Sequence, residues 1–195
     1  MQIKEAALNS HKAKKLIVDY LHSHNIRFTE DLDNTVPRIT MVFTGYDSCP
    51  GKIIESCIWF YEDDMEARIY YSELGAKICK ESTHIEGLMR LFNFIHARVF
   101  PCTSDGMGGS LYAPHHLYTP SIYVTEDDCY DITLTTLINN DFFEVAPLET
   151  EDYITAACPE LMGSLAPAIF GLLLGKINTD VAIEYVKKEI LHEAN

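Results

Sequence analysis

The sequence predicts an α+β fold in which an antiparallel sheet, built from two meanders, is flanked by helices. Two groups of short segments alternate apolar and polar residues, as half-buried strands do, and polar turns separate the segments within each group. Segments with helical spacing stand before, between and after these groups. The sequence lacks the regular alternation of strands and helices that builds a parallel nucleotide-binding sheet.

A helix and the first meander occupy the N-terminal half. Apolar residues recur every three or four positions across residues 10–24, which predicts a helix with one apolar face. Pro37 precedes an alternating segment over Arg38–Thr44, which suits the entry to a strand. Residues 53–61 and 66–71 alternate in the same way, and the acidic residues between them suit a hairpin turn. We therefore expect a helix followed by three or four antiparallel strands.

A second helix is expected over residues 83–99. Thr83 and Glu86 have the spacing of a capping box, in which two side chains bond to the backbone donors at a helix start. Besides its main apolar stripe, this helix places Leu91 and Phe94 elsewhere on its surface. Packing against a sheet covers only one of these surfaces. Either the loop that follows the helix covers the other, or Leu91 and Phe94 belong to a subunit interface of a homodimer.

The second meander and the closing helices occupy the rest of the chain. After a long loop, residues 122–124 and 130–138 alternate as strands, and residues 142–145 are a candidate return strand. Ser164 suits the cap of a short helix that is apolar on all sides and ends at Gly175. A final amphipathic helix follows. No linker divides the chain, so we expect all 195 residues to form a single domain.

The net charge excludes several classes of partner. The chain has 15 Lys and Arg against 29 Asp and Glu, which is a net charge of −14. Nucleic acids and anionic membranes require clustered positive charge, so neither is expected as a partner. The N-terminal residues do not form a secretory signal, and no apolar run reaches the length of a membrane span. These features, with six widely spaced cysteines, predict a soluble cytoplasmic protein with reduced thiols.

The negative charge is concentrated in one stretch. Residues 99–175 contain 11 acidic residues and no Lys or Arg, which is a net charge of −11. A solvated surface that keeps the protein soluble is the simpler explanation. The alternative is an acidic face on the second meander that attracts a basic protein partner, with Glu126, Asp127, Asp128 and Asp131 as its members.

The sequence contains no motif that assigns catalytic, cofactor-binding or metal-binding residues, and we expect none of these sites. A Cys-x-x-Cys pair, a His-Glu-x-x-His motif, a phosphate-binding loop before a helix and a nucleophile elbow are all missing. Side chains that could bind a metal ion gather in the Gly-rich loop, where Cys102, Asp105, His115 and His116 lie close in sequence. A hydrolase or metal-dependent enzyme that uses residues 102–116 is therefore an alternative interpretation.

The order of helix, meander, helix, meander and terminal helices, in a small acidic chain, resembles the YbjN-like family, whose fold is similar to that of the type III secretion chaperones. The most telling local match is the segment GKINTDVAIEYV of residues 175–186, which resembles the family's closing turn and capped helix. The resemblance implies a non-enzymatic protein that dimerises and binds other polypeptides. A chaperone-like or regulatory protein-binding module is thus the leading interpretation. A structural subunit of a larger complex is a further alternative.

Overall fold

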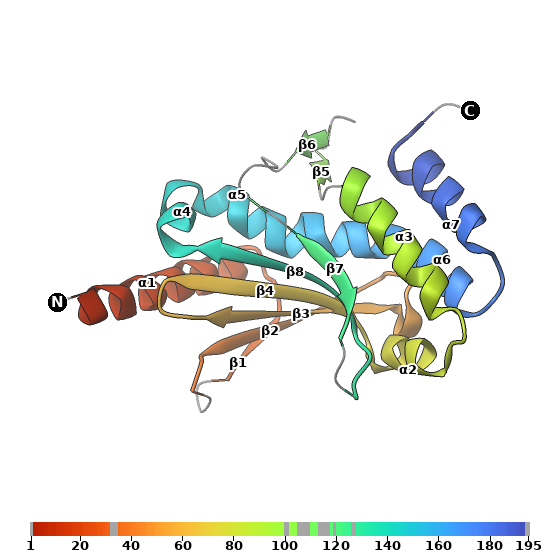
Figure 1. Ribbon diagram of the computed structural model, residues 1–195. Helices are drawn as coiled ribbons and strands as arrows, with labels where there is room; N and C mark the ends of the chain where they lie inside the picture. Colours follow the sequence, from red (N-terminus) through yellow and green to blue (C-terminus); the bar gives the residue numbers. More distant parts are fainter. Residues whose placement is uncertain are drawn as a thin grey trace.

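The chain folds into strands and helices that are segregated into two layers (Figure 1). This computed structural model describes residues 2–31, 35–99, 102–104, 110–112, 118, 120–125 and 128–193. In chain order the elements are α1 (Gln2–Ser23), β1 (Phe28–Asp31), β2 (Arg38–Thr44), a 3₁₀ turn (Pro50–Lys52), β3 (Ile53–Phe60), β4 (Asp64–Tyr71), α2 (Glu73–Glu81), α3 (Ile85–Arg98), β5 (Cys102–Ser104), β6 (Ser110–Tyr112), β7 (Ser121–Val124), β8 (Ile132–Asn139), α4 (Asn140–Val145), α5 (Pro147–Asp152), a π-helical segment (Tyr153–Ala157), α6 (Cys158–Leu173), α7 (Thr179–Tyr185) and a second π-helical segment (Val186–Ile190).

Six of the strands form one antiparallel sheet, in the order β1-β2-β3-β4-β8-β7. β8 pairs with β4, so strands from both halves of the chain belong to a single sheet. The predicted α+β class with an antiparallel sheet is confirmed. β2 matches its predicted segment, and β3 and β4 differ from theirs by one or two residues at one end. Among the described strands, β5 and β6 pair with each other and with no third strand.

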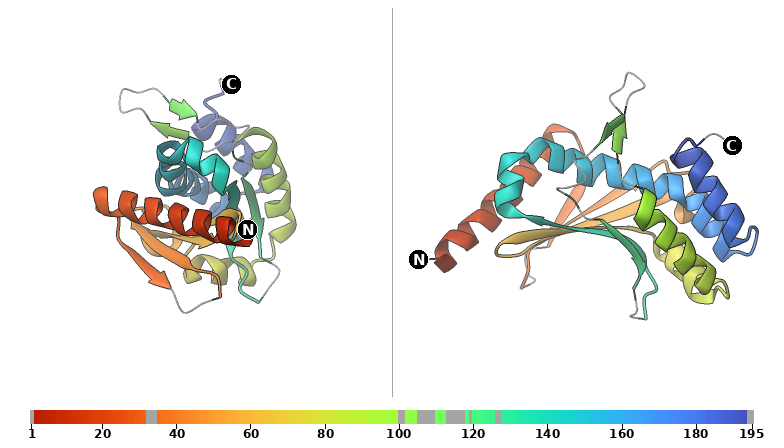
Figure 2. Two further views of the ribbon diagram at one scale, coloured as in Figure 1. Left: turned by 90° about the vertical axis from the view of Figure 1, so that its left-hand side faces the viewer. Right: turned by 45° about the horizontal axis from the view of Figure 1, so that its top comes forward.

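Helices cover one face of the six-stranded sheet, and the other face is left open in the described part of the chain (Figure 1 and Figure 2). On the covered face Ile54, Ile58, Met65 and Ile69 are all 0% exposed. The alternate residues of the same strands are mostly half-buried. The hydrophobic core therefore lies in one layer between the sheet and the helices, as is common for antiparallel sheets.

A continuous helical run over Pro147–Leu173 packs across the covered face of the sheet (Figure 2). By length and composition this run could cross a membrane, but 72% of its most apolar window is buried, which is typical of a core helix. The prediction that Ser164 caps a helix is wrong, because Ser164 lies inside α6 with an exposed side chain. A capping serine and an exposed helical serine look alike in sequence, and only the surrounding structure separates them.

The chain turns into a helix directly after β8. Residues 140–145 form α4, so the predicted return strand at residues 142–145 is wrong. Asn139 ends β8 and caps α4, since its side-chain oxygen accepts a hydrogen bond from the Asp141 N–H at 3.1 Å. This bond satisfies one of the free backbone donors of the first turn and thereby favours the helix.

Two helical features near α3 also differ from expectation. α2 follows β4 after a single residue and was not predicted; its nine residues are fewer than the roughly 11 to 18 over which a helical period is usually recognised. The predicted capping box is wrong: α3 begins at Ile85, and His84 precedes it without a side-chain cap. The Ser82 hydroxyl accepts the His84 N–H at 3.1 Å instead.

Candidate functional site

The uncovered face of the six-stranded sheet carries a group of aromatic, charged and hydroxyl side chains. We call this surface the open face and define it by the strand positions that point away from the helices. On the four inner strands its members are Arg38, Thr40, Val42 and Thr44 of β2, Ile53, Glu55, Cys57 and Trp59 of β3, Asp64, Glu66, Arg68 and Tyr70 of β4, and Thr133, Thr135, Leu137 and Asn139 of β8. The register places Trp59 opposite Glu66 and Cys57 opposite Arg68 at the centre of the face.

Trp59, the only tryptophan of the chain, lies at this centre. The guanidinium carbon of Arg68 is 5.0 Å from the centre of the Trp59 ring, which is within the range of a cation–π interaction. Arg68 Nε also donates a hydrogen bond to Glu66 Oε1 at 2.7 Å. Glu66 and Arg68 are alternate residues of β4, and alternate strand residues share a face. Arg68 is therefore held between an aromatic ring and a carboxylate.

Glu66 accepts hydrogen bonds from two further side chains. Tyr61 donates to Oε2 at 3.1 Å, and Thr135 donates to Oε1 at 3.3 Å. Burial alone would raise the pKa of Glu66, but the hydrogen bond and charge of Arg68, with the bonds from Tyr61 and Thr135, bring this pKa below its usual value. The hydrogen bond to Glu66 in turn raises the pKa of Arg68. The centre of the open face is therefore a fixed ion pair that keeps its charges at neutral pH.

Cys57 lies beside this pair, between two hydroxyl groups. Its Sγ atom is 3.3 Å from Thr40 Oγ1 and 3.2 Å from the Tyr70 hydroxyl oxygen. Burial, and then the hydrogen bond with Cys57, raises the pKa of Tyr70 well above its usual value, so Tyr70 stays protonated. Neither hydroxyl is a base that would ionise the thiol, as an activated nucleophile requires. The arrangement suits packing and hydrogen bonding rather than nucleophilic catalysis.

Other thiols are also poorly suited to catalysis. Burial raises the pKa of Cys49 and of Cys79 to about 11 and raises that of Cys158 as well.

Within the described ranges, no group of three or more His, Cys, Asp or Glu side chains could hold a metal ion. Of the loop group singled out in the sequence, Cys102 begins β5. Its other members, Asp105, His115 and His116, lie outside the described residues.

Leu91 and Phe94 of α3 both pack against the core of the same chain, Leu91 fully and Phe94 in part. Leu91 is 0% exposed and belongs to the core. Phe94 is half-buried, and the guanidinium carbon of Arg98 lies 5.6 Å from its ring centre. No second subunit is therefore needed to explain why α3 is apolar on two sides.

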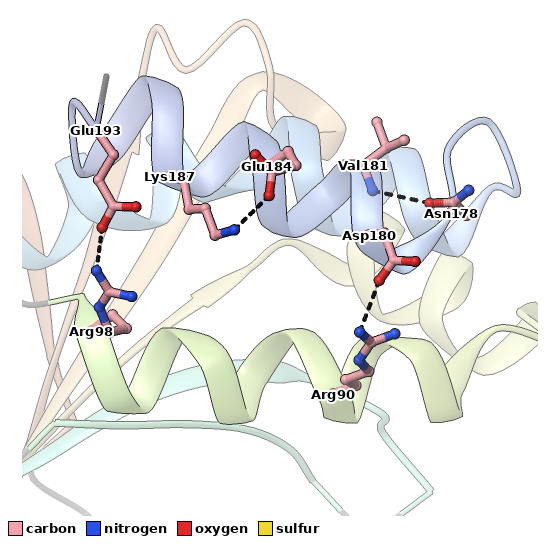
Figure 3. Close-up of polar contacts among 8 residues, drawn as sticks. All are labelled: Arg90, Arg98, Asn178, Asp180, Val181, Glu184, Lys187 and Glu193. Carbon is pink, nitrogen blue, oxygen red and sulfur yellow. Dashed lines mark hydrogen bonds and ion pairs between the residues drawn. The ribbon is translucent and has the colours of Figure 1, made fainter. Parts of the chain in front are cut away.

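The element that covers the second surface of α3 is the C-terminal helix. Figure 3 shows α3 beside α7 and the segment that follows it, with one ion pair to α7 and one to the residues after the π-helical segment. Arg90 pairs with Asp180 at 2.8 Å, and Arg98 pairs with Glu193. This cover was not among the two predicted from the sequence, and the subunit interface at Leu91 and Phe94 stays a prediction.

The predicted acidic face corresponds to the turn between β7 and β8. Asp128 is exposed and Asp131 is half-buried, while Glu126 and Asp127 lie outside the described residues. Burial, and then the charge of Asp131, raises the pKa of Glu55 on the open face. The negative potential of this turn therefore extends onto the adjoining part of the open face. The other described acidic residues of the same stretch lie on α4, α5 and α6, so its charge is divided between two regions.

Sequence reasoning did not identify the open face as a site. A signal was present, because Trp59 and Tyr61 lie on one side of their strand and the apolar Ile58 and Phe60 on the other. An aromatic pair on the less apolar side of a strand is a feature that suits an exposed binding surface. The missing information was the register, which brings Arg68 from the next strand onto Trp59.

Comparisons with known proteins give no relative. No protein-family model, no curated protein and no solved structure matches the chain. The open face is therefore interpreted from its geometry and chemistry.

Proposed function

We propose that this chain is a protein-binding module, chaperone-like or regulatory in kind, that binds its partner with the open face of the sheet. The observation that carries the proposal is the cluster of Trp59, Arg68 and Tyr70 at the centre of a face that no described helix covers. Trp, Tyr and Arg are the residue types that contribute most to the binding energy of protein interfaces. Here they are already held in place by hydrogen bonds and ring contacts, which lowers the entropy lost on binding.

The shape and composition of the open face favour a protein partner over a small molecule. Small-molecule sites are concave and bury most of the ligand, whereas this surface is the face of a sheet. Val42 is 48% exposed and Leu137 is 57% exposed, and they add apolar area on opposite sides of the polar centre. The acidic turn after β7 adds negative charge at one end, which favours a partner with basic residues there.

Two further observations support parts of this proposal. The resemblance to YbjN-like proteins and secretion chaperones favours the same role, and it adds a second copy of the chain to the candidate partners. Cys49, Cys57, Cys79 and Cys158 are thiols, as is usual in a reducing compartment such as the cytoplasm. A cytoplasmic location is therefore part of the proposal.

Photocrosslinking in cells that produce the protein tests the proposal. A photoreactive residue at Leu137 on the open face is compared with one at Val145, which is 81% exposed on α4. We expect a protein adduct from position 137 that is much weaker from position 145. Adding Trp59→Ala should abolish the adduct, because truncating a central aromatic residue removes a large share of the binding energy. Equal adducts from both positions, or an adduct that persists with Trp59→Ala, would contradict the proposal.

A further inference from the structure

β2 is longer than its neighbour on the outer side of the sheet. β1 pairs with β2 from Arg38, opposite Asp31, to Met41, opposite Phe28. Residues 42–44 continue to pair with β3 on the inner side. Among the described residues, no strand lies along the outer edge of β2 over these last three positions. Backbone groups on such an edge are available for pairing with another chain.

The step in the sheet edge forms a notch. β1 does not continue along β2, because the chain turns at Asn25, whose φ is 55°, and the Ile26 N–H bonds to the carbonyl oxygen of Leu21 at 2.9 Å. The notch has a volume of about 700 Å³. Cavities of this size hold substantial ligands, so a short extended segment of polypeptide can be accommodated.

The notch has two walls of different chemistry. Ile26, Phe28, Phe43 and Tyr46 line it and are all partly buried against the core. Its other wall belongs to the open face, where Val42 stands between threonines of the same strand. A strand added beside β2 would send alternate side chains to these two walls. The occupant therefore needs an apolar side chain at every second position.

The remaining edges of the sheet are protected against strand addition. On β7 the backbone N–H of Ile122 donates to His96 Nε2 of α3 at 2.6 Å. β1 has only four residues, and its Glu30 and Asp31 are both engaged in ion pairs. Short length, charged residues and covering side chains are the usual ways in which proteins block an edge. Residues 42–44 have none of these protections.

The charge of the notch indicates what its occupant carries. Among the described residues that line the notch, Arg27 is the only charged one, although the chain as a whole has a net charge of −14. Arg27 is exposed and forms no ion pair with a described residue. We propose that the notch binds an extended peptide segment of another protein as an added strand beside residues 42–44, with alternating apolar side chains and a carboxylate that faces Arg27.

This proposal rests on the proposed protein-binding role but uses the β2 edge of the sheet and not the centre of the open face. The notch lies at the sheet edge, whereas the centre of the open face lies around Trp59. Variants at the two surfaces can therefore separate the failure of one proposal from the failure of the other.

Short labelled peptides, followed by fluorescence anisotropy, test the notch. In each peptide Val alternates with Thr, and one of the Thr positions is replaced by Glu, Gln or Lys. At low salt we expect the Glu peptide to bind about tenfold more tightly than the Lys peptide, and to slow amide exchange at residues 42–45. Arg27→Gln should remove this preference. Lys77→Gln, which removes an exposed positive charge from α2, should preserve it.

Val42→Asp places a charge at the edge itself and should weaken all three peptides by about tenfold or more. Leu137→Asp changes the open face on β8, away from the notch, and should leave peptide binding unchanged. The proposal is overturned if the Glu peptide binds equally well to the wild type, Arg27→Gln and Val42→Asp. It is also overturned if that peptide fails to bind at about 1 mM, or if it protects amides only elsewhere. Loss of binding with Leu137→Asp alone would place the peptide on the open face and likewise overturn it.

Discussion

His96 of α3 accepts a hydrogen bond from the backbone N–H of Ile122, with 2.6 Å between Nε2 and N. Ile122 belongs to β7, the strand at one edge of the six-stranded sheet. The imidazole therefore takes the place of the carbonyl oxygen that a neighbouring strand would offer. Near the opposite edge, no described strand lies along the outer side of residues 42–44. One sheet thus has a covered edge and an edge that is open to another chain.

Replacing His96 by alanine should lower the free energy of unfolding by about 1 kcal/mol, because a backbone donor loses its acceptor. His192→Ala is the control, since His192 is exposed near the C-terminus. Urea unfolding measures the difference, and native-state amide exchange at Ile122 should become faster only in the His96 variant. Equal unfolding midpoints for the two variants would show that the bond adds nothing to stability.

The carboxyl group of Glu151 should make the protein less stable above neutral pH. Glu151 is 6% exposed, and burial raises its pKa from the ordinary 4.5 to about 7; the charge of Asp152 adds to this rise and that of His24 opposes it. Because the pKa is higher in the folded protein, the unfolded chain releases this proton first. Stability therefore falls as the pH rises from about 4.5 to about 7, and the loss persists at higher pH.

Glu151→Gln should remove this loss. Near pH 8 the variant should gain about 1 to 2 kcal/mol in the free energy of unfolding, after allowance for solvent around the carboxylate, and near pH 4 it should gain little. Urea unfolding across this pH range measures the effect, with Glu149→Gln as the control on the exposed side of α5. If both variants give parallel curves of stability against pH, the pKa of Glu151 is not raised.

The parts of the fold that could be predicted are those with a strong local pattern. Ile39, Met41 and Phe43 alternate within one segment, and the strand has the predicted bounds. The helix at residues 142–145 could not be predicted, because Phe142 and Val145 suit a strand as well as a helix. The deciding interaction is the cap that Asn139 provides from the end of β8.

The candidate sites depend on pairings that no local pattern contains. Arg68 meets Trp59 only because β3 and β4 pair in one particular register, and a shift by one residue would move the two side chains to opposite faces. The notch exists because β1 pairs with only part of β2, which is a difference in length between two strands. Such features follow from the assembled sheet and not from either strand alone.

The packing of α7 and the π-helical segment after it should depend on apolar burial far more than on the ion pairs with α3 (Figure 3). Val186 is 0% exposed, and Val186→Ala should lower the free energy of unfolding by about 1 to 3 kcal/mol through lost contacts and a cavity. Arg90→Ala removes an exposed pair with Asp180 and should cost less than about 0.5 kcal/mol.

Urea unfolding ranks these two variants, and limited proteolysis in the turn before α7 reports whether the helix has detached. Val186→Ala should make cleavage there faster, and Arg90→Ala should leave it close to the wild-type rate. A larger effect from Arg90→Ala would mean that the ion pairs, and not the core contacts, hold the C-terminal helix in place.

The contact between Gly163 and Tyr46 should be a point of tight coupling between α6 and the loop that lines the notch. A Cβ atom at Gly163 would lie 2.5 Å from Tyr46 Cδ1, and the Gly163 carbonyl oxygen accepts a hydrogen bond from Ser48 Oγ at 3.0 Å. Gly163→Ala should therefore push the ring away and lower the free energy of unfolding by about 1 to 3 kcal/mol. Gly171→Ala is the control, since its Cβ would meet only the flexible end of Ile177 at 3.0 Å.

A double-mutant cycle tests whether the clash with the ring is the cause. Removing the ring with Tyr46→Ala should make Gly163→Ala nearly harmless, so the two substitutions should couple by about 1 kcal/mol or more. Additive effects would place the cost of Gly163→Ala elsewhere in α6. Because Tyr46 also lines the notch, Gly163→Ala should weaken binding of the Glu peptide while Gly171→Ala should not, which connects the packing of the core helix to the open edge of the sheet.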